Sequence, residues 1–181
     1  MRQHPPRGFT LIELLIVVAI IGIIAAVSVP GLLRARSSAD EASAIASLRI
    51  VNSSQHAYMN SCGGGFYASS LTILGDPAPS GTAFISPDLA SGDVVNKSGY
   101  TLQMAEGSEA TAAAKDGCNP SGTAANLFSS YYATNQPQMA GSTGSRWFFT
   151  NTAGAIYVDS SDAFDGETAG NKPPSAGHIL Q

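Results

Sequence analysis

The chain has 181 residues, of which 44% are hydrophobic and only 12% are charged, and its formal net charge is −4. This length allows one modest domain with an appendage, and from Cys62 onward four basic and ten acidic side chains give a net charge of −6. An acidic surface with dispersed cations lacks the basic patch of a nucleic-acid-binding protein, so we expect no specific nucleic-acid binding.

An uncharged apolar stretch lies near the N-terminus. It runs from Leu14 to Leu33, which is 20 residues, the length of a helix that crosses a hydrocarbon core of about 30 Å. Basic residues flank the stretch on both sides, so they do not fix its orientation. We therefore predict a membrane-spanning helix, with membrane lipid as a partner.

One glutamate, Glu13, lies at the start of this stretch. A carboxylate at membrane depth costs about 2.5 to 3.5 kcal/mol on insertion scales. We therefore expect Glu13 to have a partner or a function.

The helical pattern continues beyond the membrane span. Small and apolar residues recur three and four positions apart at Ala35, Ala39, Ala42, Ile45, Ala46, Ile50 and Val51. The pattern predicts one helix from about Thr10 to about Asn60, roughly 75 Å long and too long for a bilayer. We expect its outer half to lie outside the membrane, with this small-residue stripe covered by the rest of the chain. Asp40 and Glu41 are expected to pair with Arg36 in solvent.

The residues around the start of the helix resemble a known signal. Gly8 precedes Phe9-Thr10-Leu11-Ile12-Glu13-Leu14, and the uncharged span contains Gly22 and Pro30. With the short basic leader, this sequence resembles the type III signal sequence of the type IV pilin and type II secretion pseudopilin superfamily. The resemblance implies that a prepilin peptidase cleaves between Gly8 and Phe9 and that Phe9 is N-methylated. It divides the chain into a leader (1–8), a transmembrane and assembly helix (9–61) and a head (62–181).

The resemblance also implies a partner for Glu13. The matching family residue neutralises the N-terminal amine of a neighbouring subunit, here that of Phe9, during filament assembly. Opposite charges paired in a low dielectric offset much of each other's desolvation cost. Two alternatives remain: a contact with Phe9 of the same helix, four residues away, or a glutamate at the membrane boundary with no partner.

Gly22 and Pro30 are predicted weak points of the helix. A proline inside a helix removes a hydrogen bond and costs about 3 kcal/mol or produces a kink. In filaments of the resembling family the corresponding segment tends to unwind, which makes the fibre extensible. The alternative is a simple curved helix.

The two cysteines, Cys62 and Cys118, belong to no CxxC motif or Cys/His cluster, which argues against zinc and thioredoxin-like sites. If the head is exported, we expect them to form a disulfide that closes a loop of 57 residues. In the chain-entropy model such a bridge stabilises the fold by about 4 kcal/mol. The alternative is two separate buried thiols.

The head is predicted to contain a short helical turn and an antiparallel sheet. Residues that alternate between apolar and polar, or that are rich in aromatic side chains, predict strands. The turn is expected at 67–74 and the strands at 99–104, 129–134, 146–150 and 155–158. A four-residue connection ending in Gly154 joins the last two as a hairpin. We predict an α+β fold in which the long helix packs on a small sheet, as in the pilin fold.

An acidic run, 159–167, follows the last predicted strand. Asp159, Asp162 and Asp165 are spaced three apart and are candidate ligands for a structural Ca²⁺, although the spacing is not that of an EF-hand. Major pseudopilins are similar in placing a calcium loop near their C-terminal strand. The alternative is a solvated loop. The scattered histidines adjoin no nucleophile motif, so we do not expect an enzyme.

Together these observations predict the structural subunit of a type IV pilus-like filament that serves adhesion, motility or DNA uptake. The alternative is the major pseudopilin of a type II secretion system, which forms a short piston. The expected partners are other copies of the chain, a prepilin peptidase and an inner-membrane assembly platform. The precursor is expected in a bacterial inner membrane with its head outside the cytoplasm, and the product in an extracellular pilus or periplasmic pseudopilus. A binding module anchored by an uncut helix is a further class.

Overall fold

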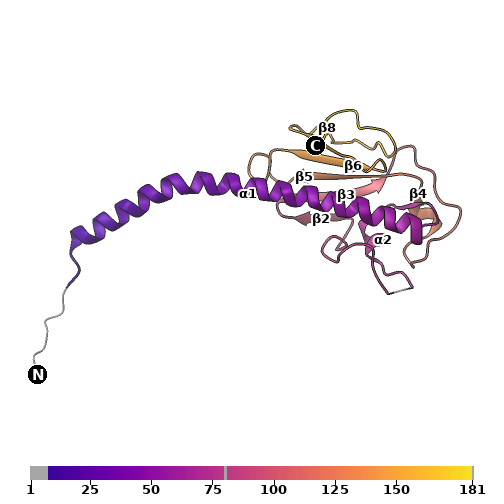
Figure 1. Ribbon diagram of the computed structural model, residues 1–181, viewed down its shortest axis with the longest axis horizontal. Coiled ribbons are helices and arrows are strands. Elements are labelled where there is room, and N and C mark those ends of the chain that lie inside the picture. The colour runs from indigo at the N-terminus through magenta and orange to yellow at the C-terminus, as the bar shows by residue number, and fades with distance from the viewer. Residues whose placement is uncertain (1–7, 80, 181) are drawn as a thin grey trace, which may run out of the picture. The chain divides into compact units, whose positions relative to one another are not determined.

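The computed structural model describes residues 8–79 and 81–180, so the predicted leader lies, apart from Gly8, outside the described residues. The chain divides into two compact units, one that ends at Arg36 and one that begins at Ser37. One long helix, α1 (Leu11–Ser61), contributes its first half to the first unit and its second half to the second unit (Figure 1). The predicted long helix is therefore confirmed, with both ends displaced by one residue.

The described part of the first unit consists of the N-terminal half of α1 and the three residues before it, 8–10. Every residue from Gly8 to Arg36 is exposed, including apolar side chains such as Leu11, which is 81% exposed, and Val27, which is 77% exposed. In the described part of the chain α1 is the one helix long and apolar enough to cross a membrane. Its stability as a helix comes from local hydrogen bonds, because no core forms around it.

The second unit contains an antiparallel sheet. In the described residues its six strands lie in the order β2-β3-β5-β6-β7-β8. They are β2 (Val94–Lys97), β3 (Tyr100–Glu106), β5 (Tyr131–Pro137), β6 (Trp147–Asn151), β7 (Ile156–Asp159) and β8 (His178–Ile179). A separate pair is formed by β1 (Tyr67–Ala68) and β4 (Leu127–Phe128), and two short helices are α2 (Leu71–Gly75) and the 3₁₀ turn η1 (Ala124–Asn126).

The four strands expected from the sequence correspond to β3, β5, β6 and β7, and the predicted hairpin joins β6 to β7, with Thr150 opposite Ile156. The sheet is wider than expected because β2 and β8 extend its two edges. A two-residue turn joins β2 to β3 with positive φ at Ser98 and Gly99, the conformation that a tight hairpin requires. The segment 67–74, expected as a helical turn, contains both β1 and part of α2.

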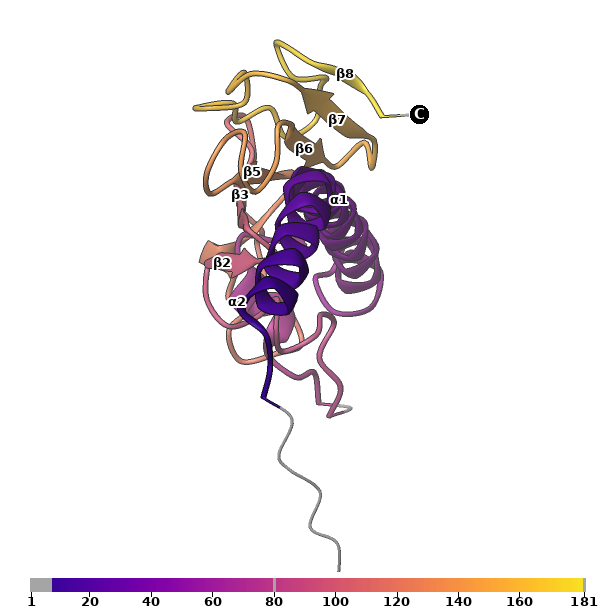
Figure 2. The same ribbon diagram turned by 90° about the vertical axis from the view of Figure 1, so that its left-hand side faces the viewer.

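The face of α1 that the head covers differs from the predicted stripe. The buried residues of α1 are Glu41, Ala44, Ser47, Leu48, Val51, Asn52, Ser54, Gln55 and Tyr58. Val51 matches the expectation, but Ala39, Ala42 and Ala46 are exposed. Both faces repeat every three or four residues, and the head selects the one with larger side chains and hydrogen-bonding groups. Figure 2 shows the strands beside the C-terminal half of α1.

The sheet buries side chains on both faces. Leu102, Tyr131 and Phe148 belong to the main core, which also includes Leu48 of α1. A second cluster lies around Phe149 and includes Phe164, whose ring stacks on that of Phe149 at 5.5 Å between centroids. Since Phe164 belongs to the acidic run 159–167, that run covers part of the sheet rather than extending freely into solvent.

Candidate functional site

The residues that the sequence connects with processing and assembly lie in the first turn of α1 and directly before it. Gly8 and Phe9 precede the helix, and the Phe9 side chain is 75% exposed. The Thr10 backbone N–H and hydroxyl donate hydrogen bonds to Glu13 Oε2, at 3.0 Å and 2.6 Å. The Glu13 N–H donates in return to Thr10 Oγ1 at 3.3 Å. This reciprocal arrangement is a capping box, which satisfies N–H groups left free at a helix N-terminus.

Glu13 therefore has a partner within its own chain, and that partner is Thr10. The intrachain contact predicted as an alternative for Glu13 was with Phe9, and the contact with Thr10 was not predicted. The signal was present, because Thr-x-x-Glu ahead of an apolar run is the sequence signature of a capping box. The pairing of Glu13 with the amine of a neighbouring copy stays a prediction.

Gly22 and Pro30 both lie inside α1, which continues through them to Ser61. A Cβ atom added to Gly22 would meet no atom within 4 Å, so packing within the chain does not require a glycine there. Unwinding of this segment in a filament stays a prediction.

The strongest charged contact between α1 and the rest of the second unit is made by Glu41. Its Oε2 lies 2.7 Å from Arg146 Nη2, and its Oε1 accepts the Ser145 N–H at 2.8 Å. Burial raises the pKa of the Glu41 carboxyl, but the bonds from Ser145 and Arg146 outweigh this effect, so the pKa lies below its usual value. The predicted solvated pairing of Glu41 with Arg36 is wrong, because the head buries Glu41.

Buried amides of α1 make further contacts with β6 and β5 of the sheet and with β1 of the separate strand pair. Asn52 Nδ2 donates to Thr150 Oγ1 at 2.9 Å, and Asn52 Oδ1 accepts the Tyr131 hydroxyl at 2.9 Å. Gln55 both donates to the Ala68 carbonyl at 2.7 Å and accepts the Ala68 N–H at 3.0 Å. Because an unpaired buried amide is costly, these bonds fix the rotation of the helix against the sheet.

The end of α1 is held by the disulfide between Cys62 and Cys118, which the sequence analysis expected. Next to it the Tyr58 hydroxyl donates to Asn119 Oδ1 at 2.9 Å, and Asn119 Nδ2 donates to the Ile73 carbonyl at 2.7 Å. Burial raises the pKa of Tyr58 to about 12, so Tyr58 stays a neutral donor at physiological pH. The bridge and these bonds join α1, α2 and the loop around Asn119.

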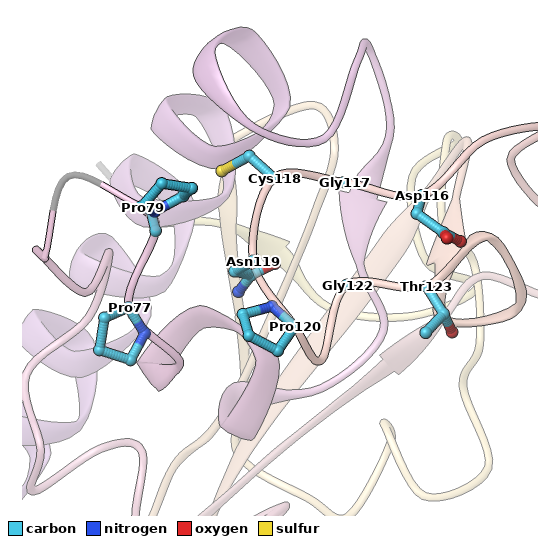
Figure 3. A pocket seen from close by; sticks show the side chains of 10 residues that line it. Pro77, Pro79, Asp116, Gly117, Cys118, Asn119, Pro120, Gly122 and Thr123 are labelled. Atoms are coloured by element: carbon cyan, nitrogen blue, oxygen red, sulfur yellow. The ribbon is translucent and has the colours of Figure 1, made fainter.

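A hollow of about 430 Å³ lies beside the disulfide, between the loop that contains Pro77 and Pro79 and the loop that contains Pro120 (Figure 3). Asn119 lines it, but its amide is already bonded to Tyr58 and Ile73. Asp116 Oδ1 accepts the backbone N–H of a neighbouring turn at 2.7 Å. These polar groups that line the hollow are thus bonded within the protein. Their role is to hold the two loops in place.

The carboxylates of the acidic run bond locally. Asp159 accepts the N–H and hydroxyl of Ser161 at 2.8 and 2.7 Å, and Glu167 accepts the Ala169 N–H at 3.0 Å. Within residues 8–79 and 81–180 no group of three or more His, Cys, Asp or Glu side chains is placed to hold a metal ion. A calcium site formed by Asp159, Asp162 and Asp165 stays a prediction, which calcium titration would test.

Comparison with known proteins concerns the N-terminal region. Residues 5–29 match the family model described as the prokaryotic N-terminal methylation motif. The chain is 41% identical over 54 residues to the type IV major pilin protein PilA of Myxococcus xanthus, which covers 30% of this chain and 24% of that protein. It is 66% identical over 35 residues to the type IV wide pilus major component PilA4 of Thermus thermophilus, which covers 19% of this chain and 27% of that protein. The match thus spans about a quarter of each relative's length. No solved structure matches the chain.

Proposed function

We propose that the chain is the structural subunit of a type IV pilus, because its residues 5–29 match the prokaryotic N-terminal methylation motif and its N-terminal region is similar to that of two type IV pilus proteins. The observation that carries the proposal is the first unit of the chain. Its matched motif opens an apolar helix whose side chains from Leu11 to Leu33 are all exposed. Such a surface requires lipid or other copies of the same helix around it.

In the proposed pathway the precursor is first a membrane protein. Its apolar helix spans the inner membrane, and prepilin peptidase cleaves before Phe9 and methylates the new amine. An assembly platform then extracts the subunit, and the helices pack together in the core of the fibre. In the membrane, lipid covers the apolar surface of the helix, and in the fibre neighbouring helices cover it. The first unit therefore keeps its hydrophobic contacts when the subunit moves from the membrane to the fibre.

Glu13 gives this packing a fixed register in the proposal. The freed ammonium of Phe9 and the carboxylate of Glu13 both lie in the apolar layer, and each is costly there without a partner of opposite charge. A neighbouring copy places the two charges together only at one axial stagger. The pair thus favours one arrangement of subunits over all others.

The second unit forms the outer part of the fibre in this proposal. It has its own core and a disulfide, and three of its four cations after Cys62 pair with acids. Its surface therefore carries the acidic surplus. Adhesion, motility or DNA uptake are the activities proposed for such a fibre.

A major pseudopilin of a type II secretion system is the second candidate. The acidic run after β7 favours it by position, since pseudopilins are similar in having a calcium loop there. The two candidates differ in the length of the filament, which is long in a pilus and short in a pseudopilus.

Electron microscopy of material sheared from the cell surface tests the proposal. Parent cells should yield long fibres that contain this chain, and E13Q should lower the fibre yield by more than about tenfold, because an ammonium is left buried without its carboxylate. E106Q, which removes an acid at the end of β3, is the matched control and should leave the yield unchanged. Absence of long fibres from parent cells would overturn the pilus proposal, and normal yield from E13Q would overturn the role of Glu13.

A further inference from the structure

A further hollow, of about 680 Å³, lies in the second unit at the edge of the sheet formed by β6, β7 and β8. A hollow of this size accommodates a small molecule or the end of a larger one. Its wall combines polar and apolar side chains. The polar ones include Arg146, Asp159 and His178, and the apolar ones are Val158, Ile179 and Leu180.

The Arg146 guanidinium is held in place but only partly used. Its Nε donates to Glu41 Oε2 at 2.8 Å, and its Nη2 lies 2.7 Å from the same oxygen. Its Cζ lies 5.6 Å from the centre of the Phe148 ring, and the side chain is 42% exposed. A guanidinium has five N–H donors, so in the described part of the chain three remain for other acceptors. A fixed cation with unused donors is suited to an anionic oxygen.

The rest of the wall limits where such an anion lies. Asp159 accepts the N–H and hydroxyl of Ser161, and these bonds lower the pKa of its carboxyl, so Asp159 is an anion itself. A second anion is therefore favoured at Arg146 and not at Asp159. Ile179, on the edge strand β8, is 55% exposed although it is apolar. The hollow thus suits a ligand that has an anionic group with hydrocarbon next to it.

The hollow lies at the end of the head that is closest along the chain to the apolar span. Strand β6 follows α1, since Arg146 at its start contacts Glu41 and Thr150 contacts Asn52 further along the helix. Glu41 comes eight residues after Leu33, the last residue of the uncharged span. Eight residues of helix rise about 12 Å, and the headgroup layer outside the hydrocarbon core is about 5 to 8 Å thick. A bilayer around the span therefore brings lipid headgroups close to Glu41.

We propose that this hollow binds a phospholipid of the membrane in which the precursor is anchored. The phosphate of the lipid lies at Arg146 and His178, whose N–H groups donate to it. The glycerol and the first acyl carbons lie against Val158, Ile179 and Leu180. This inference rests on the proposed function, because it assumes that the uncharged span lies in a membrane. The bound lipid holds the head at the membrane surface until the subunit is extracted.

Photocrosslinking of the full chain in vesicles tests the contact. A benzophenone amino acid replaces Ile179 in one protein and Val94 in another, and adducts with lipid are measured by intact mass after illumination. The two positions match, because both are apolar residues of edge strands and are 55% and 54% exposed, but Val94 lies on β2 at the opposite edge. In vesicles of phosphatidylglycerol and phosphatidylcholine, position 179 should give about fivefold more adduct than position 94. Equal adduct at the two positions would overturn the inference.

Substitutions in the chain that carries the probe at position 179 test the two donors. R146K keeps a cation for Glu41 but lacks the remaining fork of donors, and it should lower the adduct about threefold. H178A removes an exposed side chain and should lower it about twofold without affecting the core. R49K, which changes an exposed cation of α1 outside this hollow, is the control and should leave the adduct unchanged. Full adduct in both R146K and H178A would overturn the role of these donors.

The lipid and a competitor identify the group that is bound. Vesicles of digalactosyldiacylglycerol contain no phosphate and should give about threefold less adduct at position 179. Equal adduct with this lipid would mean that the contact is apolar only and would overturn the phosphate site. Excess inorganic phosphate should leave the adduct unchanged, and loss of the adduct would assign the hollow to free phosphate and overturn the inference.

These results are separate from the test of the proposed function. Strong phospholipid adduct at position 179 with no long fibres from parent cells would support the inference and overturn the pilus proposal. Long fibres from parent cells with no preference for position 179 would overturn the inference alone.

Discussion

Apolar side chains meet different surroundings in the two units of the chain. From Leu11 to Leu33 they are all exposed, whereas in the second unit Leu48, Tyr131 and Phe148 are fully buried. The two halves of α1 thus belong to different environments although they form one helix. The second unit makes its own core, whereas no other part of the described chain covers the apolar side chains of the first unit.

Polar groups follow the same division. In the second unit, Glu41, Asn52 and Gln55 find their partners on distant strands and loops of the same chain. In the first unit, Glu13 bonds only within its own helical turn, as far as the described residues extend. A single helix thus has one segment whose polar side chains bond to distant parts of the chain and another whose glutamate bonds locally.

Removal of residues 1–36 gives the largest expected effect. The fragment 37–181 should stay in solution without detergent, because its apolar side chains are mostly buried, whereas the full chain should sediment with membranes and aggregate when detergent is removed. Ultracentrifugation of both proteins measures this difference. A full chain that stays monomeric without detergent would contradict the division into two units.

Replacement of both Cys62 and Cys118 by serine should lower the free energy of unfolding of the fragment 37–181 by about 4 kcal/mol, because the bridge closes a loop of more than fifty residues. Urea unfolding followed by circular dichroism measures it. Reduction of the parent fragment is the control and should give the same loss. A loss below about 1 kcal/mol would mean that the core holds the end of α1 without the bridge.

The E41Q variant tests the contact between α1 and the head. At pH 7 it should lower the free energy of unfolding by about 2 kcal/mol, less than for a fully buried pair because the Arg146 side chain is 42% exposed. The pKa of Glu41 is lowered on folding, so its contribution is present above pH 4.5 and is lost as pH falls below that value. The difference between E41Q and the parent should therefore shrink with acidification, and a difference that persisted would contradict this account.

A matched pair of alanines tests which face of α1 is covered. Ala44 is 2% exposed, and A44L should destabilise the fragment by about 1 to 3 kcal/mol because the core has no room for three more carbon atoms. Ala42 is exposed, and A42L should change stability by less than about 0.5 kcal/mol. Thermal unfolding of both variants measures the two losses of stability. A larger loss in A42L than in A44L would mean that the covered face is the stripe predicted from the sequence.

Local patterns were sufficient for much of this fold. The uncharged run and the glycines after Ser61 predicted α1, and alternating or aromatic-rich stretches predicted β3, β5, β6 and β7. Two of the strands that were not predicted, β2 and β8, are short edge strands that pair with a strong neighbour, so their own residues carry little signal.

The contacts that were predicted wrongly depend on tertiary structure. Glu41 was paired with nearby Arg36, but its partner, Arg146, is more than a hundred residues away. The covered face of α1 was misassigned because two faces share the same spacing, and only the partner sheet selects between them. The Thr10–Glu13 contact is local, and the Thr-x-x-Glu motif could have predicted it. It was missed because a charged group, not a hydroxyl, was expected as the partner of Glu13.

The central claim is that the first unit is processed before Phe9 and then assembled. Intact-mass measurement of the subunit from sheared surface filaments tests it most directly. The account predicts a chain that lacks residues 1–8 and carries one additional methyl group on Phe9. A filament subunit that begins at Met1, or an unmodified amine on a chain cut elsewhere, would contradict it.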